Sequence, residues 1–204
     1  MMAKISSTLD FRWPRPDDQL LRRVVSWYDA MVFSDDPVER HALMSNGYFR
    51  AGHVLIDQCL ENFHERHVLI YPILFCYRHA LEMTMKGLLE SYGHRFGVSA
   101  PEPNHNLWRL WESCKAIFAQ IDNENSAADT LIVEKLIKEF HDLDARAEAF
   151  RYPVKKDGTS IDLPNDAFNL SDLRGVLESL ENFFSGADGY LDNLCSASDE
   201  VQDY

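Results

Sequence analysis

One stretch of the chain, from Tyr71 to Tyr92, constrains the fold more than any other. Its residues, YPILFCYRHALEMTMKGLLESY, separate into two arcs at about 100° per residue, the angular step of an α-helix. A broad apolar arc holds Ile73, Leu74, Cys76, Tyr77, Ala80, Leu81, Met83, Met85 and Leu88. A helix that is apolar around most of its circumference is normally enclosed by other helices, so this stretch predicts the central helix of a bundle.

The remaining narrow arc of this helix carries four ionisable side chains, which we call the ionisable ridge: Arg78, His79, Glu82 and Lys86. One interpretation is an ordinary solvated face, in which Glu82 and Lys86 pair because they lie four residues apart. The other is a charged groove in an apolar bundle, where Arg and His hold a phosphate or transfer a proton. The sequence leaves both interpretations open.

The rest of the chain supplies neighbours for the central helix. Pro37 follows an acidic pair that can cap a helix, and Asn104 is expected to cap another. Lys155 to Gly158 form a turn signal between β-prone pieces. The further predicted helices cover 19–32, 37–62, 105–121, 128–149 and 171 to about 195. The fold class is therefore all-α, an up-and-down bundle of five to six helices with a small hairpin or loop insertion near 150–169.

The predicted organisation is a single domain with short appendages. Pro14 and Pro16 favour an extended N-terminal strap over 1–18. The bundle is expected over 19–195, followed by an acidic, flexible tail over 196–204. A buried stripe of Met44, Tyr48, Ala51, Leu55 and Cys59 is predicted for the helix over 37–62.

Charge and composition exclude several classes of partner. A net charge of −13 argues against non-specific coating of DNA, although it leaves room for a local basic cleft. No apolar run is long enough to span a bilayer, and the N-terminus does not read as a signal peptide. The four cysteines share no close spacing. We therefore expect a cytoplasmic protein with no membrane partner.

A second group of ionisable residues lies near the end of the helix predicted over 128–149. His141, Asp144, Glu148 and Arg151 step by three, four and three, which places them on one side of the last turns. A solvated stripe is the ordinary explanation. Arg151 is the most unusual member because Phe150 and Tyr152 flank it and Pro153 follows, and a guanidinium held this way suits a phosphate or carboxylate.

His105 and the metal question complete the candidate residues. His105 falls in the first turn of the helix predicted over 105–121, where it either supplements the cap or serves as a ligand. Glu61 and His64 match one half of a di-iron pattern, which needs a second Glu-x-x-His that this chain lacks. A di-iron oxidase is therefore a distant alternative, and we expect neither a metal nor an organic cofactor.

Three pieces of the chain, in this order, resemble the HEPN superfamily of higher-eukaryote and prokaryote nucleotide-binding domains. The first is YRHALEMTMKGLLESYG of the central helix, which is similar to an Ala- and Leu-rich family helix with a late Lys. The second is His105-Asn106-Leu107 with Leu110, similar to the family's His-Asp-Leu helix start. The third is Arg151-Tyr152-Pro153, which resembles the Arg-Tyr-Pro of several branches. Together they cover about residues 38–195.

The resemblance implies a small up-and-down helical bundle that is frequently dimeric. Many HEPN domains are metal-independent ribonucleases of toxin–antitoxin and anti-phage systems, and others bind nucleotides or have lost activity. The nuclease branch has an Arg, four to six further residues and then a His. That motif is absent here, because none of the eight histidines has an Arg five to seven residues before it.

We therefore expect a HEPN-like module of bacterial defence or toxin–antitoxin type that holds the phosphate of a nucleotide or RNA in a basic cleft. An alternative is a divergent metal-independent ribonuclease, with His79 or His105 as acid–base and Arg151 stabilising developing charge. Another is a non-catalytic interaction subunit whose acidic surface, with Asp188 and Asp192, meets a cognate basic protein. A homodimer is also expected. The expected ligand-binding residues are Arg78, His79, Glu82, Lys86, His105, His141, Asp144, Arg151 and Tyr152.

Overall fold

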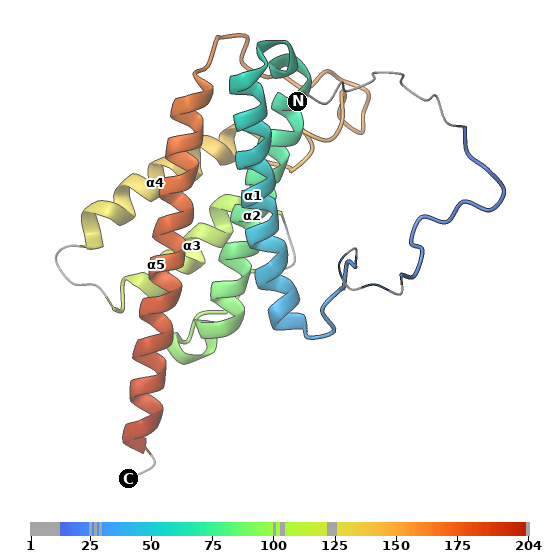
Figure 1. The fold of residues 1–204 in the computed structure, drawn as a ribbon. Coiled ribbons are helices and arrows are strands. Elements are labelled where there is room, and N and C mark those ends of the chain that lie inside the picture. Colours follow the sequence, from blue (N-terminus) through green and yellow to red (C-terminus); the bar gives the residue numbers. More distant parts are fainter. Residues whose placement is uncertain are drawn as a thin grey trace, which may run out of the picture. The chain divides into compact units, whose positions relative to one another are not determined.

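The structure is a computed structural model that describes residues 13–24, 26, 28, 30–99, 101–102, 105–121 and 126–202. The chain divides after Phe33 into an N-terminal unit and a helical unit that begins at Ser34 (Figure 1). The two units are described separately below. Residues 1–12 of the expected strap lie outside the described residues.

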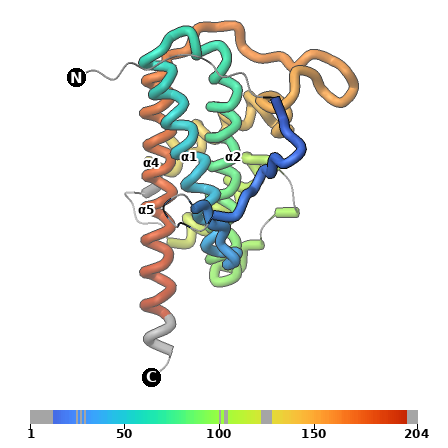
Figure 2. The backbone as a smooth tube through the Cα atoms, turned by 45° about the vertical axis from the view of Figure 1, so that its right-hand side comes forward, coloured from blue at the N-terminus to red at the C-terminus, as the bar shows by residue number. Residues whose placement is uncertain are grey.

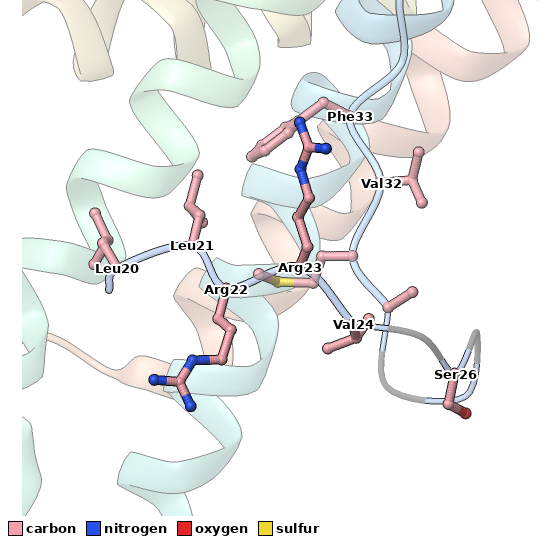
Figure 3. A pocket seen from close by; sticks show the side chains of 10 residues that line it. Leu20, Leu21, Arg22, Arg23, Val24, Ser26, Val32 and Phe33 are labelled. Atoms are coloured by element: carbon pink, nitrogen blue, oxygen red, sulfur yellow. The ribbon is translucent and has the colours of Figure 1, made fainter. Parts of the chain in front are cut away.

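The N-terminal unit has a turn at Pro16 and Asp17, and the described part of 19–32 is not an α-helix, so the prediction of a helix there is wrong for its described residues. The turn is closed by Asp18, whose carboxylate accepts the backbone N–H of Arg15 at 2.8 Å. Leu20 is 99% exposed, and its apolar neighbours also project outward around a hollow in this segment (Figure 3). A helix this short is marginal in water unless an apolar face is buried, which explains why none forms.

The helical unit confirms the predicted all-α bundle. Its helices are α1 (Pro37–Glu61), α2 (Arg66–Tyr92), α3 (Leu107–Phe118), α4 (Ser126–Leu143) and α5 (Leu170–Gln202), with short 3-10 turns η2 (Phe63–Glu65) and η3 (Gly93–Phe96). Where a hairpin was expected, the described chain has only one isolated antiparallel bridge, between Val154 and Ser160. No helix in the described part of the chain is long and apolar enough to cross a membrane.

Two of these helices begin at side-chain caps. Asp36 accepts the backbone N–H groups of Val38 and Glu39, at 2.7 and 3.3 Å, directly before α1. Asn106 caps α3 by accepting the N–H of Arg109 at 3.0 Å. The predicted cap of this helix, Asn104, lies outside the described residues. Each cap satisfies N–H groups that would otherwise lack a partner within the helix.

Helix α2 is the central helix, as predicted, because it contacts α1, α3 and α5 (Figure 1). Helices α1 and α2 form a hairpin through η2, α5 packs against both, and α4 packs against α3. The tube in Figure 2 shows α5 running beside α1 and continuing past the ends of α1 and α2. It passes residues 196–202 without a break, although a tail was expected there.

Helix α1 buries a different stripe from the one predicted. The residues that it buries are Ser45, Phe49, Gly52, Ile56 and Cys59, whereas the predicted stripe is partly exposed except for Cys59. The reason is the close approach of α1 to α2 at Gly52. A Cβ atom built there would lie 2.7–2.9 Å from three ring atoms of Tyr77, so this glycine fixes which side of α1 faces inward.

We predict opposite effects for two Gly→Ala substitutions in α1. Gly52→Ala should lower the free energy of unfolding by about 1–3 kcal/mol, because the added methyl clashes with the buried Tyr77 ring. Gly47→Ala, where nothing lies within 4 Å of the added atom, should raise it by roughly 0.5–1 kcal/mol. Urea unfolding followed by circular dichroism measures both. Equal stabilities for the two variants would contradict this account of the α1–α2 contact.

Candidate functional site

The site centres on the carboxylate of Glu82, which is 1% exposed on α2. It accepts hydrogen bonds from Arg78 Nη1 at 3.1 Å and from Lys86 Nζ at 2.6 Å, one turn to either side. It also accepts from His105 Nδ1, at 2.7 Å. Lys86 and His105 bind the same oxygen, Oε1, so their polar heads converge on one point. The ionisable ridge is therefore largely a hydrogen-bonded cluster, and not a solvated face.

Arg78 connects this carboxylate to two other segments. Its side chain is 3% exposed, and Nη2 donates to the backbone carbonyl of His105 at 2.5 Å. Its Nε lies 3.2 Å from the carbonyl oxygen and 3.3 Å from carboxylate Oδ2 of Asp144. The guanidinium thereby ties α2 to the segment before α3 and to the turn after α4. We call Arg78, Glu82, Lys86, His105 and Asp144 the Glu82 network.

Asp144 ends α4 earlier than predicted. The helix stops at Leu143, and Asp144 Oδ1 accepts the backbone N–H groups of Glu148 and Ala149 at 2.7 and 3.1 Å. The chain turns here, with Ala147 in the left-handed region at φ 58°. The expected single stripe of His141, Asp144, Glu148 and Arg151 on a continuing helix is therefore wrong. A side chain that bonds to nearby backbone competes with helix formation, which explains the early stop.

Burial and charge act against each other in the Glu82 network. Burial pushes the pKa of Glu82 upward, but the hydrogen bonds from Lys86 and His105 outweigh it, and the pKa is lowered. Burial lowers the pKa of Arg78, although Asp144 and Glu82 oppose that shift. Two carboxylates thus face two permanent cations, and His105 adds a third cation when it is protonated. The buried part of the network, Arg78, Glu82 and Asp144, has one more negative than positive charge, and Lys86 balances it from the edge.

The outer edge consists of Lys86 and His105, whose side chains are 27% and 62% exposed. Glu82 fixes the Nδ1 side of the imidazole, and Nε2 has no partner among the described residues. An ammonium and an oriented imidazole therefore reach solvent side by side. Such a pair can bind an anion or exchange a proton with a bound ligand.

His79 belongs to the same arc of α2 but has different neighbours. Its ring packs edge-on against Tyr48 of α1, with the ring centres 4.5 Å apart, and stacks on Phe75 at 5.8 Å. Burial lowers the pKa of His79, the charge of Glu82 opposes that shift, and Lys86 lowers the pKa further. His79 therefore joins α1 to α2 as an aromatic side chain and is not hydrogen-bonded into the Glu82 network.

The remaining predicted site residues lie around the turn after α4. Arg151 is exposed, donates from Nε to the carbonyl of Ala147 at 2.6 Å, and holds its guanidinium 5.4 Å from the ring centre of Tyr152. Burial is the main cause that lowers the pKa of Arg78, and the positive charge of Arg151 lowers that pKa further. His141 Nδ1 is buried without a partner, and burial lowers the pKa of this ring. None of these three side chains hydrogen-bonds to the network in the described structure.

Sequence reasoning missed a second polar chain, which crosses the α1–α2–α5 contact. Glu181 of α5 accepts from His53 Nε2 at 2.8 Å, and Nδ1 of the same ring accepts the hydroxyl proton of Tyr77 at 2.8 Å. Burial raises the pKa of Tyr77. The three residues are too far apart in the sequence for any spacing signal to have linked them.

Comparisons with protein-family models, curated proteins and solved structures found no match to this chain. The resemblance to HEPN domains therefore rests on the three sequence pieces given above. Among the residues that the structure describes, no group of three His, Cys, Asp or Glu side chains is arranged to hold a metal ion.

We predict that Arg78 is essential for stability and that Arg151 is not. Arg78→Met should lower the free energy of unfolding by about 3–5 kcal/mol, because it leaves Glu82 and Asp144 buried with fewer partners. The same substitution at exposed Arg151 should change it by about 0.5 kcal/mol or less. Urea unfolding at neutral pH compares the two variants. A mild effect at Arg78 would show that the network contributes little to the fold.

We also predict that acid destabilises the protein partly through His79. Its pKa is lower in the folded state than in the unfolded chain, so the unfolded state binds the proton more readily. The stabilisation is present above the unfolded pKa of about 6.5 and is lost as the pH falls. His79→Phe keeps the ring packing and should show a smaller drop in Tm between about pH 7 and pH 5. Exposed His67→Phe is the control, and an equal drop in both variants would contradict the prediction.

Proposed function

We propose that this protein is a nucleotide- or RNA-binding module that takes a phosphate at the outer edge of the Glu82 network. The observation that carries the proposal is the shared oxygen: Glu82 Oε1 holds both Lys86 Nζ at 2.6 Å and His105 Nδ1 at 2.7 Å. Two partly exposed side chains, an ammonium and an imidazole, are thereby fixed beside each other before any ligand arrives. Binding then requires little further ordering of side chains, which favours affinity.

The roles of the candidate residues differ according to their exposure. Lys86 and His105 are the contact residues, because they alone among the network cations reach solvent. Arg78, Glu82 and Asp144 act as a buried support, since the guanidinium and both carboxylates are enclosed and hydrogen-bonded. Support of this kind keeps the contact groups in one geometry.

Arg151 and Tyr152 supply a second set of contacts in this proposal. The Arg151 guanidinium is exposed and over the ring of Tyr152, which is itself 55% exposed. A guanidinium suits a phosphate, and an exposed aromatic ring can stack on a base. These features favour a ligand that carries both a phosphate and a base.

The biological setting is proposed from the HEPN resemblance alone. It points to bacterial defence or toxin–antitoxin systems, in which homodimers and cognate protein partners are common. The all-α bundle with a central helix is compatible with that resemblance. A shared fold by itself does not fix a function.

A second candidate function, a divergent metal-independent ribonuclease, is favoured by the pairing of Glu82 with His105. A carboxylate on Nδ1 holds an imidazole in one tautomer and leaves Nε2 available to take or give a proton. Lys86, or an Arg such as Arg151, would stabilise charge that develops on the phosphate. His79 is the weaker acid–base candidate, because its ring is packed between Tyr48 and Phe75.

The first test of the proposal measures binding of a labelled single-stranded RNA by fluorescence anisotropy. Lys86→Met and His105→Ala should each weaken binding by roughly tenfold, because the first removes the ammonium that pairs with the phosphate and the second removes the imidazole held beside it. Lys135→Met on α4 removes the same charge from a side chain that is 75% exposed and serves as the control. If Lys86→Met and Lys135→Met weaken binding equally, the loss of affinity follows only from the change in net charge, and the proposed site is wrong.

Incubation with total RNA and with tRNA, with and without a chelator, separates the two candidate functions. Cleavage that resists the chelator and disappears in His105→Ala would establish the ribonuclease. Binding without cleavage would favour the binding module. If the protein neither binds nor cleaves RNA and also fails to bind nucleotides, both functions are wrong.

A further inference from the structure

A groove of about 820 Å³ runs between α1, α2 and α5 of the helical unit. This volume falls within the usual range for ligand-binding clefts. Phe49, Leu88 and Phe184 form its floor, and the exposed side chains of Val38 and Ala42 add an apolar wall on α1. None of the residues that line it belongs to the Glu82 network, so the groove is a separate feature from the proposed phosphate site.

The rim of this groove is strongly acidic. Its carboxylates are Glu90, Glu181, Asp188 and Asp192, and the only Lys or Arg among its lining residues is Arg95. Two of the carboxylates are held by hydrogen bonds from residues other than Lys or Arg. Asp188 Oδ1 accepts from the Tyr92 hydroxyl at 2.9 Å, and Glu181 accepts from His53. The groove therefore presents fixed negative charge above an apolar floor.

The sequence of α5 adds to this charge. From Gly175 to Gln202 the helix contains six acidic residues and no Lys or Arg. Negative side chains near a helix C-terminus are unfavourable, because the helix dipole places negative charge at the same end. This end also extends past α1 and α2 (Figure 1, Figure 2). A cationic partner along α5 would relieve that repulsion.

We propose that this groove binds a basic segment of a partner protein in extended form. The α5 residues that line it run from Glu181 to Ser196, which corresponds to about 22 Å of helix. An extended chain covers that length with about seven residues. Alternate side chains of such a segment point in opposite directions, so apolar residues can face the floor and wall while Lys or Arg face the acidic rim.

The test uses a fluorescein-labelled heptapeptide of alternating Lys and Leu, with a Glu and Leu peptide as its control. Only the Lys peptide should bind to the full chain. Glu90→Gln combined with Asp192→Asn removes two rim charges from opposite helices and should weaken binding by roughly tenfold. Glu139→Gln combined with Asp142→Asn removes the same charge from exposed positions on α4 and should leave affinity nearly unchanged.

A steric pair of variants tests the groove without changing charge. Ser185→Trp should block binding, because Ser185 lines the groove, whereas Ser179→Trp on the same helix lies outside it and should not. The proposal is overturned if the Lys peptide does not bind, if both charge pairs weaken binding equally, or if Ser185→Trp binds as well as Ser179→Trp. These results do not depend on Lys86 or His105, so failure here is distinguishable from failure of the RNA-binding proposal.

Discussion

The buried contact between Arg78 and Glu82 is the constraint on which the rest of the bundle depends. Taking two charges out of water is costly, and the cost is offset only when their remaining hydrogen-bonding groups find partners. Here Lys86 of α2 supplies one partner, and the others come from outside α2: the carbonyl of His105, the turn at Asp144, and the imidazole of His105. The central helix is therefore tied to the segment before α3 and to the turn after α4.

The same constraint shapes the candidate site. Arg78 holds Oε2 of Glu82, so Oε1 is left to position Lys86 and His105 at the surface. The network leaves Lys86 and His105 at its exposed edge, outside a buried part with two carboxylates and one guanidinium. A protein with a net charge of −13 can thus still hold an ammonium and an imidazole side by side at its surface.

Helix α5 carries seven of the chain's 33 acidic residues. Asp188 and Asp192 stand at the rim of the groove between α1, α2 and α5, and no Lys or Arg occurs on α5 after Arg174. The helical unit thus carries two chemically opposite surfaces, a cationic edge on the Glu82 network and an acidic groove. The two proposals place different ligands on these surfaces, a phosphate at one and a basic peptide at the other.

The sequence by itself determined the helical class, the central position of α2 and the alignment of Arg78, Glu82 and Lys86, since all of these follow from the helical repeat. It could not place His105 beside Glu82 or Asp144 beside Arg78, because 23 and 66 residues separate these pairs along the chain and only packing brings them together. It also grouped His79 with the ionisable ridge, whereas in the structure this ring packs against Tyr48 and Phe75. Tertiary structure decided these points. The periodicity of one helix shows which of its residues share a face, but it does not show which side chains of other segments contact that face.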